Sequence, residues 1–239
     1  LRKLEPKSLE ILLYAARLYS LMRKTQNAVD LLNEAVKMEP ENDQLQHSLA
    51  LAYMAQDEDD RAIVTMRKAL TLNPQKDSYY FELGALMEKS GDYKGAIESM
   101  RQAIELNPLH SNAHNFLGYM YALEGYDLDQ ALEHLKKALT IQPRNGYFLD
   151  SLGWIYFKKG EPKKALTQIQ KALIYTEPDP VLYDHLGDIF FSLGNYDEAS
   201  GAWRNSLFLA ENPKDDPGGE MPDPRTLKNK IDKAKRLLQ

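Results

Sequence analysis

The chain has 239 residues, of which 43% are hydrophobic and 27% are charged, and its formal net charge is −5. An acidic chain of this kind lacks the basic face that nucleic-acid binding requires, and no run of about 18 apolar residues that could span a membrane is present. The absence of cysteine excludes disulfides, thiolate metal ligands and cysteine nucleophiles.

The sequence repeats with a period of 34 residues. Prolines keep this spacing at Pro6, Pro40, Pro74 and Pro108, and the next, Pro143, follows after 35 residues. A fixed period of this size indicates a stacked repeat architecture. We therefore predict six repeats, counted from position 1 at the first residue of each. They span residues 9–42, 43–76, 77–110, 111–145, 146–179 and 180–213.

Residues 1–8 align with the end of a repeat, because Leu1 falls at position 27 and Pro6 at position 32. We expect this segment to be the tail of a truncated preceding repeat, so that the chain would be a fragment of a longer array. The alternative is a free N-terminal helical turn that only mimics the register.

Each repeat begins with an apolar stripe at positions 4, 7, 8 and 11, the spacing of one face of an α-helix. From the third repeat onward, position 8 is glycine, which costs a helix about 1 kcal/mol relative to alanine. This recurrence predicts that a paired helix approaches too closely to leave room for a side chain there. The four glycines are Gly84, Gly118, Gly153 and Gly187.

A second helical pattern completes each repeat, with alanine at position 20 and alanine or serine at position 27. Position 24 between them is large, and Trp203 is its largest member. Small residues on either side of a large one predict two interlocked helices. A proline near position 32 ends the second helix, because proline cannot continue it.

The last 26 residues differ from the repeats. Residues 214–224 are rich in proline, glycine and aspartate and predict a loop. Residues 225–239 follow with a stripe of Leu227, Ile231, Ala234 and Leu238. A lone amphipathic helix there is expected to cap the exposed edge of the last repeat. Its remaining Lys and Arg residues form either a solvated face or a surface for an acidic partner.

These residues resemble the tetratricopeptide repeat family over almost the whole chain. The resemblance implies an all-α fold: an α-solenoid superhelix of stacked antiparallel helix pairs, with about six complete repeats and a C-terminal capping helix. It also implies a non-catalytic scaffold that binds a protein or an extended peptide in a concave groove.

Positions 2, 5, 9 and 12 point roughly 130° away from the core stripe, and by this resemblance they line the groove. The opposing interpretation is that neighbouring helices cover these side chains, and for Trp154 both interpretations stay open. Aromatic anchors with a few polar groups are typical of binding surfaces. The predicted partner-binding residues are His47, Phe81, Asn112, Asn115, Tyr119, Tyr147, Asp150, Trp154, Phe157, Asp188 and Phe191.

Co-chaperones of the tetratricopeptide repeat family bind acidic peptide tails through Lys and Asn at positions 5 and 9. In this chain the corresponding residues include Asp150, Asp184 and Asp188, which would repel an anionic tail. His110 and His114 are four residues apart but have no third ligand near them in sequence, so no metal site is predicted. Without a phosphate-binding loop or a nucleophile–base pair, we expect no cofactor and no enzymatic activity.

The last repeats are also similar to large bacterial TPR lipoproteins of the cell envelope, through the segments "DSLGW" (150–154) and "HLGD" (185–188). That similarity implies an adaptor for periplasmic processing proteases, on the periplasmic side of the outer membrane, with a lipid-bearing cysteine upstream of Leu1. The alternatives are a cytoplasmic assembly scaffold and a regulatory TPR domain of a longer protein.

Overall fold

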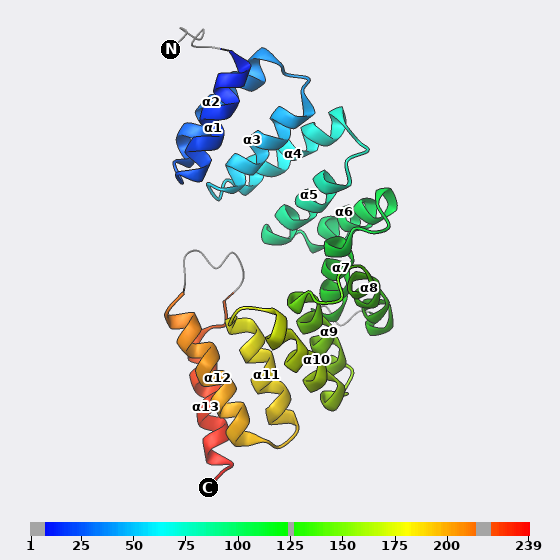
Figure 1. Cartoon of the computed structure of the whole chain (residues 1–239), viewed down its shortest axis with the longest axis vertical. Coiled ribbons are helices and arrows are strands. Elements are labelled where there is room, and N and C mark those ends of the chain that lie inside the picture. Colours follow the sequence, from blue (N-terminus) through cyan, green and yellow to red (C-terminus); the bar gives the residue numbers. More distant parts are fainter. Residues whose placement is uncertain (1–7, 124–126, 214–220) are drawn as a thin grey trace. The chain divides into compact units, whose positions relative to one another are not determined.

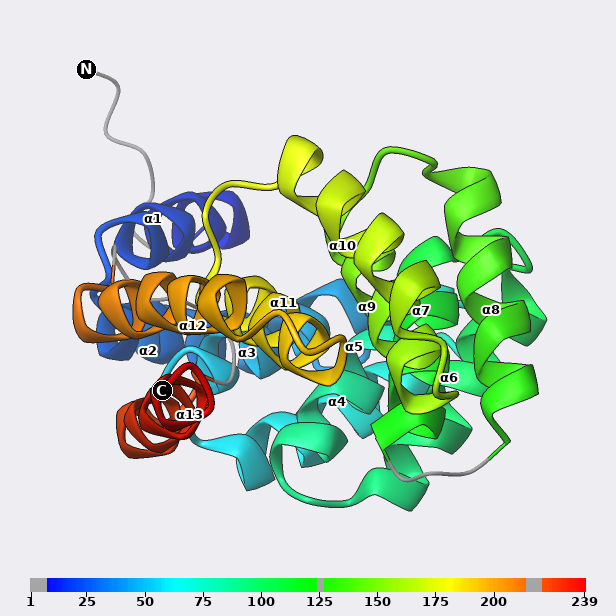
Figure 2. The ribbon, with the colours of Figure 1, turned by 90° about the horizontal axis from the view of Figure 1, so that it is seen from below.

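The computed structural model describes residues 8–123, 127–213 and 221–239 (Figures 1 and 2). All regular secondary structure in these residues is α-helical, which confirms the predicted class. The contacts divide the chain into two compact halves, an N-terminal half of Leu1–Ala113 and a C-terminal half of His114–Gln239.

The helices of the N-terminal half are α1 (Leu9–Leu21), α2 (Thr25–Met38), α3 (Asp43–Met54), α4 (Asp59–Leu72), α5 (Asp77–Lys89) and α6 (Tyr93–Leu106). The boundary between the halves lies within α7 (Ser111–Leu123). The C-terminal half continues with α8 (Leu128–Ile141), α9 (Gly146–Lys158), α10 (Pro162–Tyr175), α11 (Pro180–Ser192), α12 (Tyr196–Glu211) and α13 (Pro224–Arg236).

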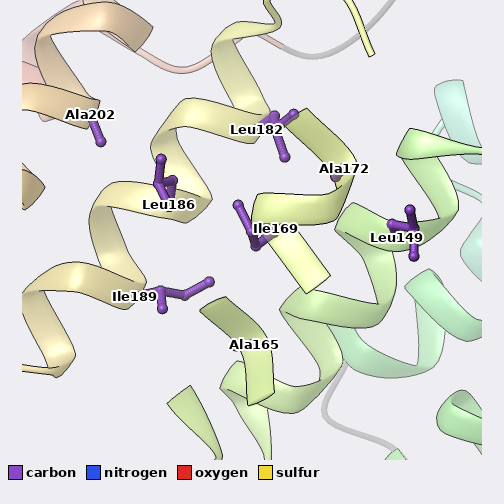
Figure 3. Packing of buried hydrophobic residues seen from close by; sticks show 8 residues of the cluster. All are labelled: Leu149, Ala165, Ile169, Ala172, Leu182, Leu186, Ile189 and Ala202. Atoms are coloured by element: carbon purple, nitrogen blue, oxygen red, sulfur yellow. The ribbon is translucent and has the colours of Figure 1, made fainter. Parts of the chain in front are cut away.

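The helices form antiparallel pairs, and within each half the second helix of one pair packs on the first helix of the next, as α4 does on α5 and α10 on α11. First helices also meet, since α9 contacts α11. Figure 3 shows how one hydrophobic cluster runs through α9, α10, α11 and α12. This arrangement confirms the predicted solenoid of stacked helix pairs. The cluster comprises Leu149, Ala165, Ile169, Ala172, Leu182, Leu186, Ile189 and Ala202.

Small residues allow the paired helices to approach closely. The alanines of position 20 are almost fully buried in all six repeats, and so are the residues of position 27. A Cβ atom added to Gly84 would lie 2.8 Å from Met100 Cε, and one added to Gly153 would lie 2.8 Å from Ile169 Cδ1. The glycines of position 8 therefore leave room for the large residue of position 24, as predicted. Trp203, one of these large residues, is 2% exposed and belongs to the core.

In the five helix pairs whose turns the structure describes, position 15 has a left-handed backbone, a feature that the sequence pattern did not reveal. Gly160 has a φ of 74° there, which costs glycine little. In the first two repeats the same position is Arg23, with a φ of 55°, and Asp57, with a φ of 57°. These two residues carry backbone strain that the later repeats avoid.

Helix α13 caps the last repeat, as predicted. Leu227, Ile231 and Ala234 are buried in a cluster with Ala199 and Trp203 of α12. The helix begins at Pro224 rather than at 225, because the side chain of its N-cap residue, Asp223, accepts hydrogen bonds from the first free backbone N–H groups.

Leu238 does not belong to the capping stripe, and its inclusion was wrong. Helix α13 ends at Arg236, where the N–H of Leu237 bonds to the carbonyl of Ala234, so Leu238 lies beyond the helix and is 53% exposed. The predicted tail at 1–8 falls almost wholly outside the described residues. Ser8, its last residue, is the N-cap of α1. Of the predicted loop 214–224, residues 214–220 also lie outside them.

None of the helices in the described parts of the chain combines the length and the apolar character that a membrane span would need.

We expect Ala131→Leu to lower the free energy of unfolding by about 1–3 kcal/mol through overpacking. Ala131 is fully buried, and its carbonyl oxygen would lie 3.0 Å from a Cβ atom added to Gly118. Urea unfolding followed by circular dichroism measures the change. Ala55→Leu, at an exposed helix end, is the matched control and should be nearly neutral. Equal stability of both variants would contradict the packing described for α7 and α8.

Candidate partner-binding face

Helix α9 presents a stripe of four predicted site residues. Tyr147, Asp150, Trp154 and Phe157 follow one another at intervals of three and four residues, so they share one face of the helix. Tyr147 is 60% exposed, and the other three are half-buried. The fold therefore places these four residues on one face of α9.

The indole ring of Trp154 is stacked against the neighbouring repeat. Its centroid lies 4.1 Å from that of the His185 ring on α11, with an interplanar angle of 17°, and 5.1 Å from that of Phe157. The ammonium group of Lys158 lies 5.0 Å from the indole ring. Part of the ring is thus covered by an adjacent repeat, as the opposing interpretation held, while the residue as a whole stays partly exposed.

His185 is buried and forms an ion pair with Asp150. Its Nδ1 lies 2.9 Å from Asp150 Oδ1, and the histidine is only 8% exposed. Burial alone would lower the pKa of His185, but the charge and the hydrogen bond of Asp150 outweigh it and raise this pKa above its usual value. Asp184 and Asp188 add to this effect. The protonated ring would then stack on Trp154, an arrangement that a cation–π interaction stabilises.

The N-terminal half uses the same register with the charges exchanged. His47, at position 5 of its repeat, pairs with Glu82 at position 6 of the next repeat. Asp150 and His185 occupy these same two positions, again 35 residues apart. Sequence reasoning missed both pairs, although an acidic residue and a histidine at this spacing in two different repeats was a usable signal.

His47 is also part of a network with Tyr79 and Asp43. Its ring stacks on Tyr79 at a centroid distance of 4.4 Å, and the Tyr79 hydroxyl donates a hydrogen bond of 3.0 Å to Asp43 Oδ2. Burial, together with the bond to Asp43, raises the pKa of Tyr79 to about 12. His47 is thus held mainly by contacts between repeats, and it is half-buried.

The other predicted residues of α5 and α7 are less closely associated. The ring of Phe81 lies 4.9 Å from that of His110, and Asn112 is exposed. Asn115 and Tyr119 are half-buried in the C-terminal half. The covered Oδ1 of Asn115 has no hydrogen-bond partner within the described residues.

Asp188 and Phe191 lie against the capping helix rather than in the group around Trp154. Asp188 Oδ1 lies 2.7 Å from Lys230 Nζ and accepts a hydrogen bond of 3.2 Å from Trp203 Nε1. The Phe191 ring lies 5.6 Å from that of Trp203, and the Lys233 ammonium lies 4.9 Å from the Phe191 ring. The predicted site residues of α9 and α11 thus form two groups, one around Trp154 and one beneath α13.

The two histidines that were weighed as metal ligands have separate partners. His110 Nδ1 accepts a hydrogen bond of 3.2 Å from the backbone N–H of Ala113, whereas His114 Nδ1 lies 2.8 Å from Nδ1 of His134. In the described ranges, no three His, Cys, Asp or Glu side chains gather into a group that could hold a metal ion.

Two tetratricopeptide repeat models match the sequence, one over residues 21–87 and the other over residues 82–146. Together they cover residues 21–146, more than half of the 239 residues. The chain belongs to the tetratricopeptide repeat family.

Two curated proteins are similar in sequence to part of this TPR chain. It is 37% identical over 91 residues to TPR repeat-containing protein MJ1428 of Methanocaldococcus jannaschii, and 35% identical over 98 residues to the BBSome complex member BBS4 of Bos taurus. Each match covers 38% of the chain, but only 16% and 18% of the two relatives. The chain thus matches less than a fifth of the length of these proteins.

Solved structures support the fold. PilF of Pseudomonas aeruginosa superposes with a TM-score of 0.73 at 16% identity, covering 95% of this chain and 96% of PilF. The Cut9–Hcn1 hetero-tetramer of the APC/C gives a TM-score of 0.76 at 19% identity, covering 98% of this chain and 44% of the other. PilW, a type IV pilus biogenesis factor, gives 0.71 at 19% identity, covering 88% of this chain and 96% of PilW.

We expect Asp150→Asn to lower the pKa of His185, because burial then acts without the opposing carboxylate. The folded-state pKa of wild-type His185 is raised, so its ion pair stabilises the fold fully below the unfolded pKa of about 6.5. That contribution is lost as the pH rises through the folded pKa. The stability difference between wild type and Asp150→Asn should therefore be largest at acidic pH.

An NMR titration of the His185 ring protons measures the pKa, and urea unfolding at several pH values measures the stability. Asp129→Asn, which removes a carboxylate from the exposed pair with Lys159, is the control and should leave His185 unchanged. The same His185 pKa in wild type and Asp150→Asn would refute the role of the ion pair.

Proposed function

We propose that this TPR chain is a non-catalytic scaffold that binds a protein or an extended peptide partner on the exposed face of α9, with Trp154 as the main anchor. Tetratricopeptide repeat proteins generally mediate protein–protein interactions. The observation that carries the proposal is the state of Trp154, which is held in place by stacking and yet remains partly exposed.

A ring in this state is suited to anchoring a partner. Because His185 and Phe157 already fix the orientation of the Trp154 indole, little side-chain freedom is left to lose on binding. Rigid aromatic residues of this kind dominate the energetics of many interfaces. The exposed ring of Tyr147 offers a second apolar contact about two helical turns away on the same stripe. Lys158 and Asp150 supply polar groups near Trp154.

The comparisons support the class of function more than any particular partner. BBS4 is named as a member of the BBSome complex, and Cut9–Hcn1 is named as a hetero-tetramer of the APC/C. Those names describe assemblies of the other proteins. For this chain they favour a binding role over catalysis.

A random peptide library displayed on phage tests the proposal, with the immobilised chain as bait. We expect the selected peptides to lose about 30-fold or more in affinity with Trp154→Ala, the loss of about 2 kcal/mol that is typical of an aromatic anchor. Stability should fall as well, since each lost aromatic pair is worth about 0.5–1.5 kcal/mol. Affinity is therefore measured by titration calorimetry at a temperature where the variant is folded.

Phe208→Ala is the matched control, because Phe208 is an aromatic residue of the same half that is 65% exposed on α12. It should bind the selected peptides as wild type does. If folded Trp154→Ala binds them with unchanged affinity, or if Phe208→Ala loses as much, Trp154 is not the anchor.

We further propose that the protein acts as an adaptor on the periplasmic side of a bacterial outer membrane. Support comes from the similarity of the segments 150–154 and 185–188 to envelope lipoproteins and from the folds of PilF and PilW. Fractionation of the source cells with an antibody to this chain should recover it with the outer membrane, and labelled palmitate should be incorporated. Recovery in the cytosol would instead favour an assembly scaffold, and a fused catalytic domain would favour a regulatory role.

A further inference from the structure

Helix α13 follows the register of a seventh first helix, with one residue that breaks the pattern. Counted from Pro224, its core positions 4, 8 and 11 are Leu227, Ile231 and Ala234, all of which are buried. Position 7 is Lys230. In the six repeats the same position is always apolar. Its residues there are Ala15, Leu49, Leu83, Leu117, Leu152 and Leu186.

The ammonium group of Lys230 lies between two aspartates of α11. Its Nζ is 2.8 Å from Asp184 Oδ1 and 2.7 Å from Asp188 Oδ1, and the three side chains are 20–26% exposed. The Trp203 indole fixes Asp188 through its Nε1 hydrogen bond, and Lys230 Nζ lies 5.7 Å from the centre of that ring. Two carboxylates and an aromatic ring therefore surround the ammonium group of Lys230.

The electrostatics agree with this geometry. Burial would lower the pKa of Lys230, but its hydrogen bonds to Asp184 and Asp188 prevail and raise this pKa. Burial raises the pKa of Asp188 in spite of the nearby lysine. The aspartates thus stabilise a cation between them, and without one they would be two carboxylates in a partly buried place.

Besides Lys230, three apolar residues of α13 pack against the last repeat, and the remainder of the helix is strongly basic. Its buried apolar residues are two branched side chains and one alanine, whereas its sequence contains six basic residues and a single acidic one. A second cation, Lys233, lies over the Phe191 ring. Charge therefore contributes a large part of the complementarity between α13 and the surface beneath it.

We propose that the face formed by Asp184, Asp188, Phe191 and Trp203 is a receptor for a basic amphipathic helix, and that α13 is its tethered occupant, which a lysine-bearing helix of a partner protein replaces. The required pattern is the one that α13 displays: Leu-x-x-Lys-Ile-x-x-Ala. Two carboxylates select a cation at the fourth residue of this pattern, and the apolar residues on either side of it fill the edge of the last repeat.

Tethering makes α13 an internal competitor. A segment that is covalently linked to its own site acts at an effective concentration on the order of millimolar, so a partner helix binds well only if it competes with α13. Partner access to this face is thereby limited by α13. This inference is independent of the proposed function, because it concerns a helical ligand beneath α13 and not a peptide anchored by Trp154.

A fluorescently labelled synthetic peptide of residues 221–239 tests the proposal in trans, by anisotropy titration against the full chain. We expect the Lys230→Ala chain to bind this peptide at least about tenfold more tightly than the wild-type chain, because its own α13 no longer fills the aspartate pair. Lys228→Ala is the matched control: it removes the same charge from the same helix, but from the surface pair with Glu211. It should bind the peptide as weakly as wild type.

Two further measurements distinguish peptide binding through the aspartate pair from binding through apolar capping contacts alone. The reference is binding of the intact peptide to the Lys230→Ala chain. A peptide with alanine in place of Lys230 should bind that chain at least about tenfold more weakly than the intact peptide does. The intact peptide should lose affinity by the same factor when Asp184→Asn and Asp188→Asn are added to that chain. Circular dichroism verifies folding, and Lys230→Met, which keeps the methylene stem, replaces Lys230→Ala if that variant unfolds.

Equal peptide affinity for the wild-type and Lys230→Ala chains would overturn the proposal, as would equal binding of the intact and the alanine-bearing peptides. Unfolding of both Lys230 variants would also overturn it, because a helix that can be replaced cannot be essential for the fold. If sedimentation shows that the Lys230→Ala chain dimerises by exchanging α13, the occupant is a second copy of the chain and the proposed partner is wrong.

Discussion

The fold depends on the interlocking of one small and one large residue inside each helix pair. In the last repeat, Gly187 leaves the space that the Trp203 ring fills, and Gly153 does the same for Ile169. A helical glycine costs about 1 kcal/mol, whereas burying a large apolar side chain gains roughly 1.5–3 kcal/mol, so the exchange favours the closely packed pair. Because the contact recurs in every later repeat, it also gives the pairs a constant geometry.

Constant pair geometry fixes which positions of adjacent repeats meet. Position 5 of one repeat faces position 6 of the next, and the chain places a histidine and an acidic residue in contact there twice, as His47–Glu82 and as Asp150–His185. Because such pairs are partly desolvated, a shifted register that separated the partners would leave polar or charged groups without compensation. In the C-terminal half this pair also positions the ring against which Trp154 stacks. The orientation of the candidate anchor is therefore a consequence of repeat stacking.

The sequence predicted what is periodic and missed what depends on contacts between particular side chains. Helix pairs, the buried alanines, the glycines of position 8 and the capping role of α13 all followed from residues that recur at fixed intervals. The left-handed turn at Arg23 could not be predicted in this way, because arginine has no preference for that conformation, whereas Asp57 belongs to a residue type that adopts it more often. The grouping of Asp188 with α13 was also missed, because helix α12 and the non-repeating segment after it separate the two in sequence. Whether Trp154 meets a partner stays a prediction, as stacking covers only part of its ring.

The lysine of α13 is difficult to explain by capping alone. A leucine at position 7 would cover the last repeat as it does within the array, and burying apolar side chains in place of an ion pair is often neutral or stabilising. That choice would, however, leave Asp184 and Asp188 without a cation in a partly buried place, where their mutual repulsion is costly. The two aspartates therefore require the lysine as a counter-charge, and the three side chains together form one complementary contact. Such a contact selects which helix may lie on the last repeat, whereas an apolar edge would accept any amphipathic helix of suitable size.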